Sequence, residues 1–174
     1  GWSLTLILSH GSLQLLFSTI PSPFKLKSGL AAHHITMIVP LLFAACHGVH
    51  LWILDEGVAA ERAGSYEDRI FSKHDGSLAL THFMCGLQIY DLLSTTLVSD
   101  LRRTDNLAHH AATLLFVLAC LLPTAGPCYT HFSGFLFGIM EISSVPLIIS
   151  ALCREFPHLT ESSLGKKINN IARI

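Results

Sequence analysis

Charged side chains are scarce in this chain of 174 residues: 13% are Asp, Glu, Lys or Arg, whereas 51% are hydrophobic. The formal net charge is −1, so the chain lacks the basic surface through which proteins bind nucleic-acid phosphates. The few charges fall in short connectors, and the segments between them are nearly uncharged. This distribution predicts a polytopic membrane protein with no nucleic-acid partner.

Cysteine pairs with metal-binding or redox spacing are also missing. None of the five cysteines belongs to a C-x-x-C motif, and most of them fall in apolar segments: Cys46, Cys85, Cys120, Cys128 and Cys153. We interpret them as small packing residues and expect no metal and no other cofactor.

Five apolar segments are long enough to span a membrane, for which a helix needs about 20 residues. They are Trp2–Ile20, Ile35–Leu54, Ser77–Ser99, Leu107–Leu122 and His131–Leu152. Leu164–Ile174 is predicted to begin a sixth helix that the sequence cuts short. We therefore expect an all-α, multi-pass transmembrane bundle of five to six helices, with a first helix and linker at 1–29 and one membrane domain at 30–174.

The longest polar connector runs from Asp55 to Gly76. Apolar residues recur within it at helical spacing, namely Ala59, Ala63, Tyr66 and Ile70. The pattern is typical of a helix lying on the membrane surface, and a solvated loop is the alternative.

Lysine and arginine in the short loops predict the orientation, because they concentrate on the cytosolic side of a membrane. Alternate connectors on one side hold Lys25, Lys27, Arg102, Arg103, Arg154, Lys166 and Lys167, and those on the other side hold Arg62, Arg69 and Lys73. The first set is expected to face the cytosol or its organellar equivalent.

Asp91 and Glu141 are the only formal charges well inside the predicted spans. An isolated charge in hydrocarbon costs several kcal/mol, so both acids are expected to face the bundle interior. At about 1.5 Å per residue from the cytosolic helix ends, Asp91 lies roughly 12 Å deep and Glu141 roughly 16 Å. His109 and His110 enter about 5 Å below the same surface. These side chains can line one polar shaft if their helices are neighbours.

Each acid shares a helix face with residues suited to binding or packing. Gln88, Asp91 and Thr95 lie on one side of the third span, whereas Gly134 and Gly138 form a G-x-x-x-G ridge that continues to Glu141. We assign Gln88, Thr95, Gly134, Gly138 and Glu141 as candidate lipid-binding residues. The alternative is that the acids only hydrogen-bond between packed helices.

His109 and His110 are the candidate catalytic histidines, with Asp91 as the residue that orients them. A neutral imidazole can act as a general base or accept an acyl group. The alternative is that both side chains extend towards lipid headgroups. His47 and His50, at i, i+3, offer only two neighbouring ligands, so no metal site is expected there.

Three short motifs together resemble the TLC-domain family. They are Tyr90-Asp91, His109-His110 and G-I-M-E-I-S-S-V-P at Gly138–Pro146, in the family's order and spacing. This family includes ceramide synthases, translocon-associated proteins and small TLC-domain membrane proteins, and residues 30–174 look most like the small proteins. The resemblance implies a TLC-type bundle that continues beyond Ile174, and a lipid-facing cavity. It also implies location in the endoplasmic reticulum, with an organellar inner membrane as the alternative.

The chain departs from the ceramide synthases at one point that bears on catalysis. Their two aspartates ahead of the glutamate would fall near Gly134 and Phe137, where this chain has no acid. The resemblance therefore implies the fold more strongly than an activity. Three functions remain open: a protein that binds an acyl chain or influences membrane lipid composition, a non-catalytic structural subunit of a larger membrane complex, and an acyl-CoA-dependent lipid N-acyltransferase. The expected partners are membrane lipids and, for the second function, other membrane subunits.

Overall fold

The computed structural model describes residues 1–19, 24–71, 73–122, 128–157 and 159. Regular structure in this part of the chain is entirely helical, so the all-α prediction is confirmed. The five longest α-helices are α1 (Trp2–Thr19), α2 (Ser28–Val49), α5 (Asp75–Leu97), α6 (Thr104–Leu121) and α8 (Ser144–Glu155). The helix predicted at Leu164–Ile174 lies outside the described residues.

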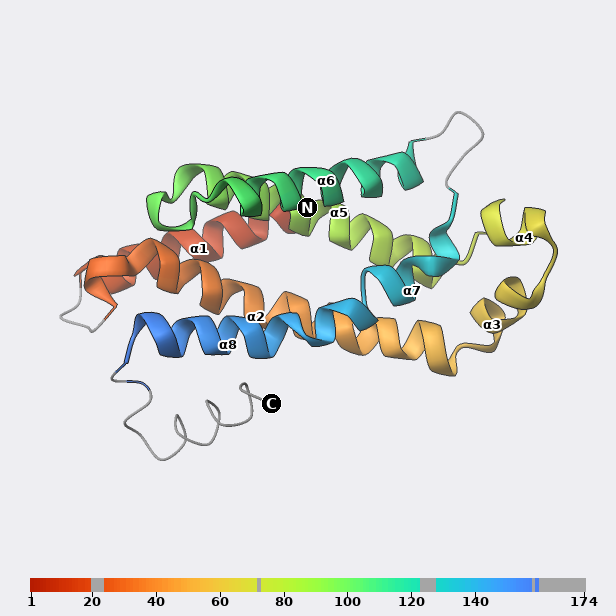
Figure 1. The fold of residues 1–174 in the computed structure, drawn as a ribbon, viewed down its shortest axis with the longest axis horizontal. Coiled ribbons are helices and arrows are strands. Elements are labelled where there is room, and N and C mark those ends of the chain that lie inside the picture. The colour runs from red at the N-terminus through yellow and green to blue at the C-terminus, as the bar shows by residue number, and fades with distance from the viewer. Residues whose placement is uncertain (20–23, 72, 123–127, 158, 160–174) are drawn as a thin grey trace.

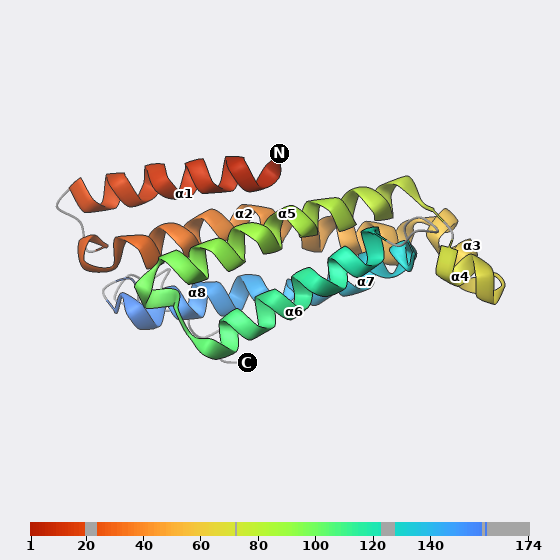
Figure 2. The ribbon, with the colours of Figure 1, turned by 90° about the horizontal axis from the view of Figure 1, so that it is seen from above.

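The long helices form an elongated bundle of three layers (Figures 1 and 2). The middle layer is α2 with α5; α1 packs on one side of it, and α6 and α8 lie on the other side. Consecutive long helices run in opposite directions, so the connectors alternate between the two ends of the bundle. The connector between α5 and α6 and the end of α8 lie at the same end as the start of α2, and Lys27 there forms an ion pair with Glu155.

Two helical stretches of the described chain are long and apolar enough to cross a membrane, Lys25–Leu54 and Thr130–Glu155. Length and composition alone also fit the core helix of a soluble protein, but in the second stretch only 17% of the most apolar window is buried. Large apolar side chains on the outer faces of other helices are exposed as well, among them Leu8, Leu15, Leu97 and Leu115.

The second helix begins earlier than the predicted Ile35. Leu30, Ala31 and Ala32 are buried, so the apolar packing that stabilises α2 already starts at its first turn. The helix continues through Pro40 and ends in a π-helical turn, His50–Leu54, which the Asp55 amide closes by donating to the His50 carbonyl at 3.0 Å.

The fifth predicted span, His131–Leu152, lies within a helical stretch that is long and apolar enough to cross a membrane, but it is not one continuous α-helix. The segment consists of a 3-10 turn (η4, Thr130–Phe132), a short helix (α7, Ser133–Leu136), a second 3-10 turn (η5, Ile139–Ile142) and α8. Gly138, with φ −122° and ψ −72°, separates the two halves. Pro146 lies in the first turn of α8, where its missing N–H needs no acceptor, whereas in a continuous helix its ring would clash with the Ile142 carbonyl.

The break lies where η5 crosses α2 at very short range. A Cβ atom added to Gly138 would lie 2.3 Å from the Gly48 Cα, and one added to Gly48 would lie 2.6 Å from the Gly134 carbonyl oxygen. Glycines at all three positions let the two backbones touch. The small residues of the G-x-x-x-G ridge therefore do meet another helix, which is α2.

The connector after α2 contains two short helices, α3 (Glu56–Ala63) and α4 (Tyr66–Phe71), rather than the single predicted surface helix. Asp55 caps α3 by accepting a hydrogen bond from the Val58 amide at 3.0 Å, and this bond lowers the pKa of the Asp55 carboxyl. The Arg62 guanidinium packs 3.9 Å above the Trp52 ring.

The two short helices bury one apolar side chain each. Val58 of α3 and Ile70 of α4 are buried, whereas Ala59, Ala63 and Tyr66, which were predicted to share an apolar face with Ile70, are exposed. The chain breaks at Gly64 and Ser65, which ends the assumed helical period between the two short helices.

Candidate functional site

A polar cavity of about 350 Å³ lies between α2, α5, α6 and the η5–α8 segment. α6 and α8 both pack on the middle layer but lie apart from each other, so the space between them stays open. Its polar lining comes from four separate helical segments: His33, His34, Gln88, Asp91, Thr95, Asn106, His109, His110, Glu141 and Ser144. Its apolar lining is Met37, Leu41, Leu101, Leu147 and Ile148.

Asp91 forms the centre of this site. Its side chain is 6% exposed and lies between two imidazole rings from different helices. One carboxylate oxygen is 3.7 Å from His33 Nε2 on α2, and the other is 3.6 Å from His110 Nδ1 on α6. The predicted interior position of Asp91 thus has a physical reason, since two potential donors approach the buried carboxylate.

The two adjacent histidines of α6 are not equivalent. His110 is half-buried, and its Nδ1 lies 3.2 Å from the Gln88 side-chain oxygen as well as near Asp91. His109 is exposed at the edge of the cavity and contacts the ring of His110. Neighbouring residues on a helix point about 100° apart, so only one of them reaches the carboxylate.

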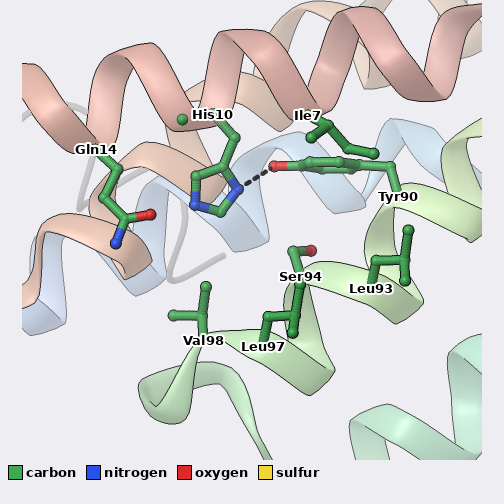
Figure 3. A pocket seen from close by; sticks show the side chains of 9 residues that line it. Ile7, His10, Gln14, Tyr90, Leu93, Ser94, Leu97 and Val98 are labelled. Atoms are coloured by element: carbon green, nitrogen blue, oxygen red, sulfur yellow. Dashed lines mark hydrogen bonds between the residues drawn. The ribbon is translucent and has the colours of Figure 1, made fainter.

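A second set of polar contacts extends from His33 through the middle layer to α1. His33 Nδ1 lies 3.1 Å from the Ser94 hydroxyl and 3.3 Å from the Tyr90 hydroxyl. The Tyr90 hydroxyl in turn lies 2.9 Å from His10 Nδ1 on α1 (Figure 3). Hydrogen bonds and short polar contacts thus connect His10 on one side of the bundle with His110 on the other.

The number of hydroxyl protons limits which of these hydrogen bonds can form at the same time. Tyr90 has one hydroxyl proton, so it donates to either His10 or His33. Ser94 also has one hydroxyl proton, which it can donate either to the Asp91 carbonyl oxygen at 3.1 Å or to His33 Nδ1 at 3.1 Å. When it donates to His33, the proton of that ring is on Nε2, which lies 3.7 Å from the Asp91 carboxyl oxygen.

Glu141 lines the same cavity from the other side, on η5. Its residue is half-buried rather than enclosed, so it lies at the edge of the site and not inside the glycine contact. Gln88 and Thr95, which share the helix face of Asp91, are buried and line the cavity as well. The structure thus brings together six of the eight candidate site residues.

Gly134 and Gly138 are the two that it separates from the cavity. Both pack against Gly48 and its neighbours on α2, so the crossing helices occupy the space that a lipid would need. Close helix packing is the role that the structure gives these two glycines, and lipid binding at them stays a prediction.

His47 and His50 lie away from this site. His47 stacks on Phe43, with ring centroids 5.6 Å apart, and neither His47 nor His50 lines the cavity. Within the described ranges no group of three His, Cys, Asp or Glu residues is arranged to hold a metal ion. All five cysteines are free thiols, and Cys120 and Cys153 are buried.

Sequence reasoning missed the contributions of His10, His33, Tyr90 and Ser94 to one network. The available signal was the presence of polar side chains within apolar segments, which must find partners in the bundle. Their pairing depends on how α1, α2 and α5 pack, and a single sequence does not report that packing.

The chemistry of the site follows from this arrangement. The Asp91–His110 pair can accept or deliver a proton and can hydrogen-bond a hydroxyl, an amide or an amine. The apolar lining beside it accommodates hydrocarbon.

The chain matches no protein-family model, no curated protein and no solved structure.

Proposed function

We propose that this chain is an integral membrane protein of TLC type that binds a lipid in the cavity around Asp91 and His110. The observation that carries the proposal is the convergence of buried polar side chains from four helical segments on one cavity inside a bundle with an apolar exterior. A soluble protein shows the opposite distribution, with few large apolar patches exposed.

The proposed bundle has five membrane crossings: α1, α2, α5, α6 and the broken segment from η4 to α8. α2 and α5 have 22 and 23 residues, and α1 and α6 have 18 each, which is near the length that a bilayer requires. The break at Gly138 fits a membrane because it is covered by α2, and irregular backbone at membrane depth is tolerated where protein surrounds it. The endoplasmic reticulum is the proposed location.

This arrangement places the polar cavity near one membrane face. Lys25, Lys27, Arg102, Arg103 and Arg154 lie at the end of the bundle to which the cavity is closest, and Arg62, Arg69 and Lys73 lie at the opposite end. The positive-inside rule assigns the first end to the cytosol.

Cysteine labelling tests this topology. In a variant whose five native cysteines are replaced, single cysteines at Arg103 and Arg69, both exposed, should react with an impermeant maleimide from opposite sides of sealed vesicles. Labelling of both positions without permeabilisation would contradict the five-crossing arrangement.

The ligand that fits the cavity is amphiphilic. Small-molecule sites typically measure about 300–1,000 Å³, so a cavity of this size holds the polar end and first carbons of a lipid, with the rest of the chain extending between α6 and α8. The polar end would meet His110, Gln88 and Asp91. Leu147 and Ile148 on α8 would contact the hydrocarbon.

Acyl transfer is the second candidate function, because the 3.6 Å approach of Asp91 to His110 resembles the pair of a general base and its orienting carboxylate. In this assignment His110 would be the base or acyl acceptor. The two acids that ceramide synthases carry are missing at Gly134 and Phe137, which weighs against acyl transfer. Both positions are also buried away from the polar cavity.

Native mass spectrometry of the protein purified in detergent tests lipid binding. We expect wild type to retain a lipid, and His110→Leu and Gln88→Leu to reduce its occupancy about tenfold, because each removes a hydrogen-bonding group that the polar end needs. His82→Leu is the matched control: His82 lies exposed on α5, does not line the cavity and hydrogen-bonds the Leu78 carbonyl of its own helix.

Equal lipid occupancy in His110→Leu and His82→Leu would contradict the proposed site. Melting curves recorded on the same samples would separate lost binding from lost folding. N-acylation of a long-chain base with acyl-CoA, measured in parallel, would decide between binding alone and acyl transfer.

A further inference from the structure

A second cavity lies on the opposite side of the middle layer, between α1 and the second half of α5 (Figure 3). Its volume is about 210 Å³. Apolar side chains form most of its wall, namely Ile7, Leu93, Leu97 and Val98. None of its described lining residues also lines the cavity around Asp91.

Polar side chains from both α1 and α5 line part of this second cavity. Figure 3 shows His10 and Gln14 reaching down from α1, and Tyr90 and Ser94 approaching from α5. His10 is 6% exposed; its Nδ1 is engaged by Tyr90, and its buried Nε2 forms no hydrogen bond of good geometry among the described residues, although the ring interacts with the Gly29 backbone. An unpaired buried nitrogen costs free energy, so a ligand that pairs with it gains affinity.

The α1 wall of the cavity is open at Gly11. A Cβ atom added to Gly11 would meet no other atom within 4 Å, and the Gly11 and Gln14 residues are both exposed. In a membrane-spanning bundle this opening faces the lipid hydrocarbon, where the Gln14 amide has no water to bind. A molecule from the bilayer can therefore enter sideways.

We propose that the α1–α5 cavity is a second lipid site, which takes an uncharged lipid whose polar group is a hydroxyl. The described lining contains no Lys, Arg, Asp or Glu, so nothing in it matches a phosphate, a carboxylate or an ammonium group. A hydroxyl both donates and accepts, so it pairs with His10 Nε2 in either tautomer of the ring and with the Gln14 amide. The apolar body of the lipid would lie against Leu93 and Leu97.

The entry route rests on the proposed membrane location, whereas the binding chemistry depends only on the cavity. Three photoactivatable probes in phosphatidylcholine nanodiscs test the site: a diazirine-bearing sterol, a diazirine-bearing long-chain alcohol, and the same chain without its hydroxyl. At least one hydroxyl probe should label the peptide that contains Leu93, Leu97 and Val98. The probe without a hydroxyl should label it about five- to tenfold less, which corresponds to the loss of one hydrogen bond.

A substitution that fills the cavity gives the sharpest control. Gly11→Leu places a side chain in open space without a clash and replaces a poor helix former, so the fold should be retained while labelling falls at least fivefold. Ser12→Leu, at an exposed neighbouring position that does not line the cavity, should leave labelling unchanged. Gln14→Leu should lower labelling by the hydroxyl probes and not by the third probe.

Equal labelling by the probes with and without a hydroxyl, or labelling unaffected by Gly11→Leu, would overturn the second site. The result is independent of the polar cavity, because His110→Leu should leave labelling here unchanged. If His110→Leu does not reduce lipid occupancy but Gly11→Leu abolishes labelling, then the proposed function fails and the second site stands.

Discussion

Gly138→Leu is expected to melt about 10 °C below wild type in detergent, because its side chain would be built into the backbone of another helix. The added Cβ would lie 2.3 Å from the Gly48 Cα and 3.0 Å from the Ala44 carbonyl oxygen. Backbone atoms of α2 cannot rotate away as a flexible side chain would, so the crossing of η5 over α2 must open.

Two further variants make this prediction specific. Gly11→Leu is the same substitution in open space on α1, and its melting temperature should equal or slightly exceed that of wild type. Gly48→Leu disrupts the same crossing, so the double variant with Gly138→Leu should lose less stability than the sum of the two single losses. A wild-type melt for Gly138→Leu would mean that the two backbones do not touch.

Asp91→Leu is expected to reduce lipid occupancy of the polar cavity about tenfold or more, since a buried polar group left without its polar neighbour costs roughly 1–3 kcal/mol. Leucine would leave His33 Nε2 and His110 Nδ1 without the carboxylate that lies 3.7 and 3.6 Å from them. Asp91→Asn retains an oxygen acceptor and should keep part of the occupancy. Native mass spectrometry measures both changes.

Asp105→Leu is the matched control for that experiment. Asp105 is an exposed acid in the first turn of α6, paired with Arg103 at 2.9 Å, and it does not line the cavity. Occupancy should stay at the wild-type level in this variant. A similar loss in Asp105→Leu and Asp91→Leu would indicate a general effect of removing an acid and not a site at Asp91.

The positions of α1, α5 and α6 could be predicted from the sequence because uncharged apolar runs of sufficient length are easy to recognise. The interior orientation of Asp91 could be predicted from the cost of a charge in hydrocarbon. The sequence also predicted that Asp91 and His110 can line one polar shaft if their helices are neighbours, and in the structure the Asp91 carboxyl lies 3.6 Å from His110 Nδ1.

The break in the fifth segment was missed because its two causes act at a distance. Gly138 leaves helical geometry where α2 crosses it, and Pro146 only shows its effect once the helix start at Ser144 is known. Periodicity reports which residues share a face, whereas it does not report which backbone lies against that face. For the same reason the sequence alone did not reveal the network that joins His10, Tyr90 and His33, because its contacts depend on how the helices pack.

The adjacent residues Tyr90 and Asp91 show why packing decides the site. They point to different sides of α5, Tyr90 towards α1 and Asp91 towards α6, and His33 of α2 reaches both. The imidazole ring of His33 therefore lies between the contacts on the two sides of the middle layer.

A density map of the protein in lipid nanodiscs, at a resolution that shows side chains, tests most directly whether a lipid occupies the cavity around Asp91 and His110. We predict elongated density in the cavity between α6 and α8, with its polar end within hydrogen-bonding distance of His110 or Asp91 and its apolar part beside Leu147 and Ile148. A cavity that contains only water, or one closed by direct packing of α6 against α8, would contradict lipid binding at Asp91 and His110.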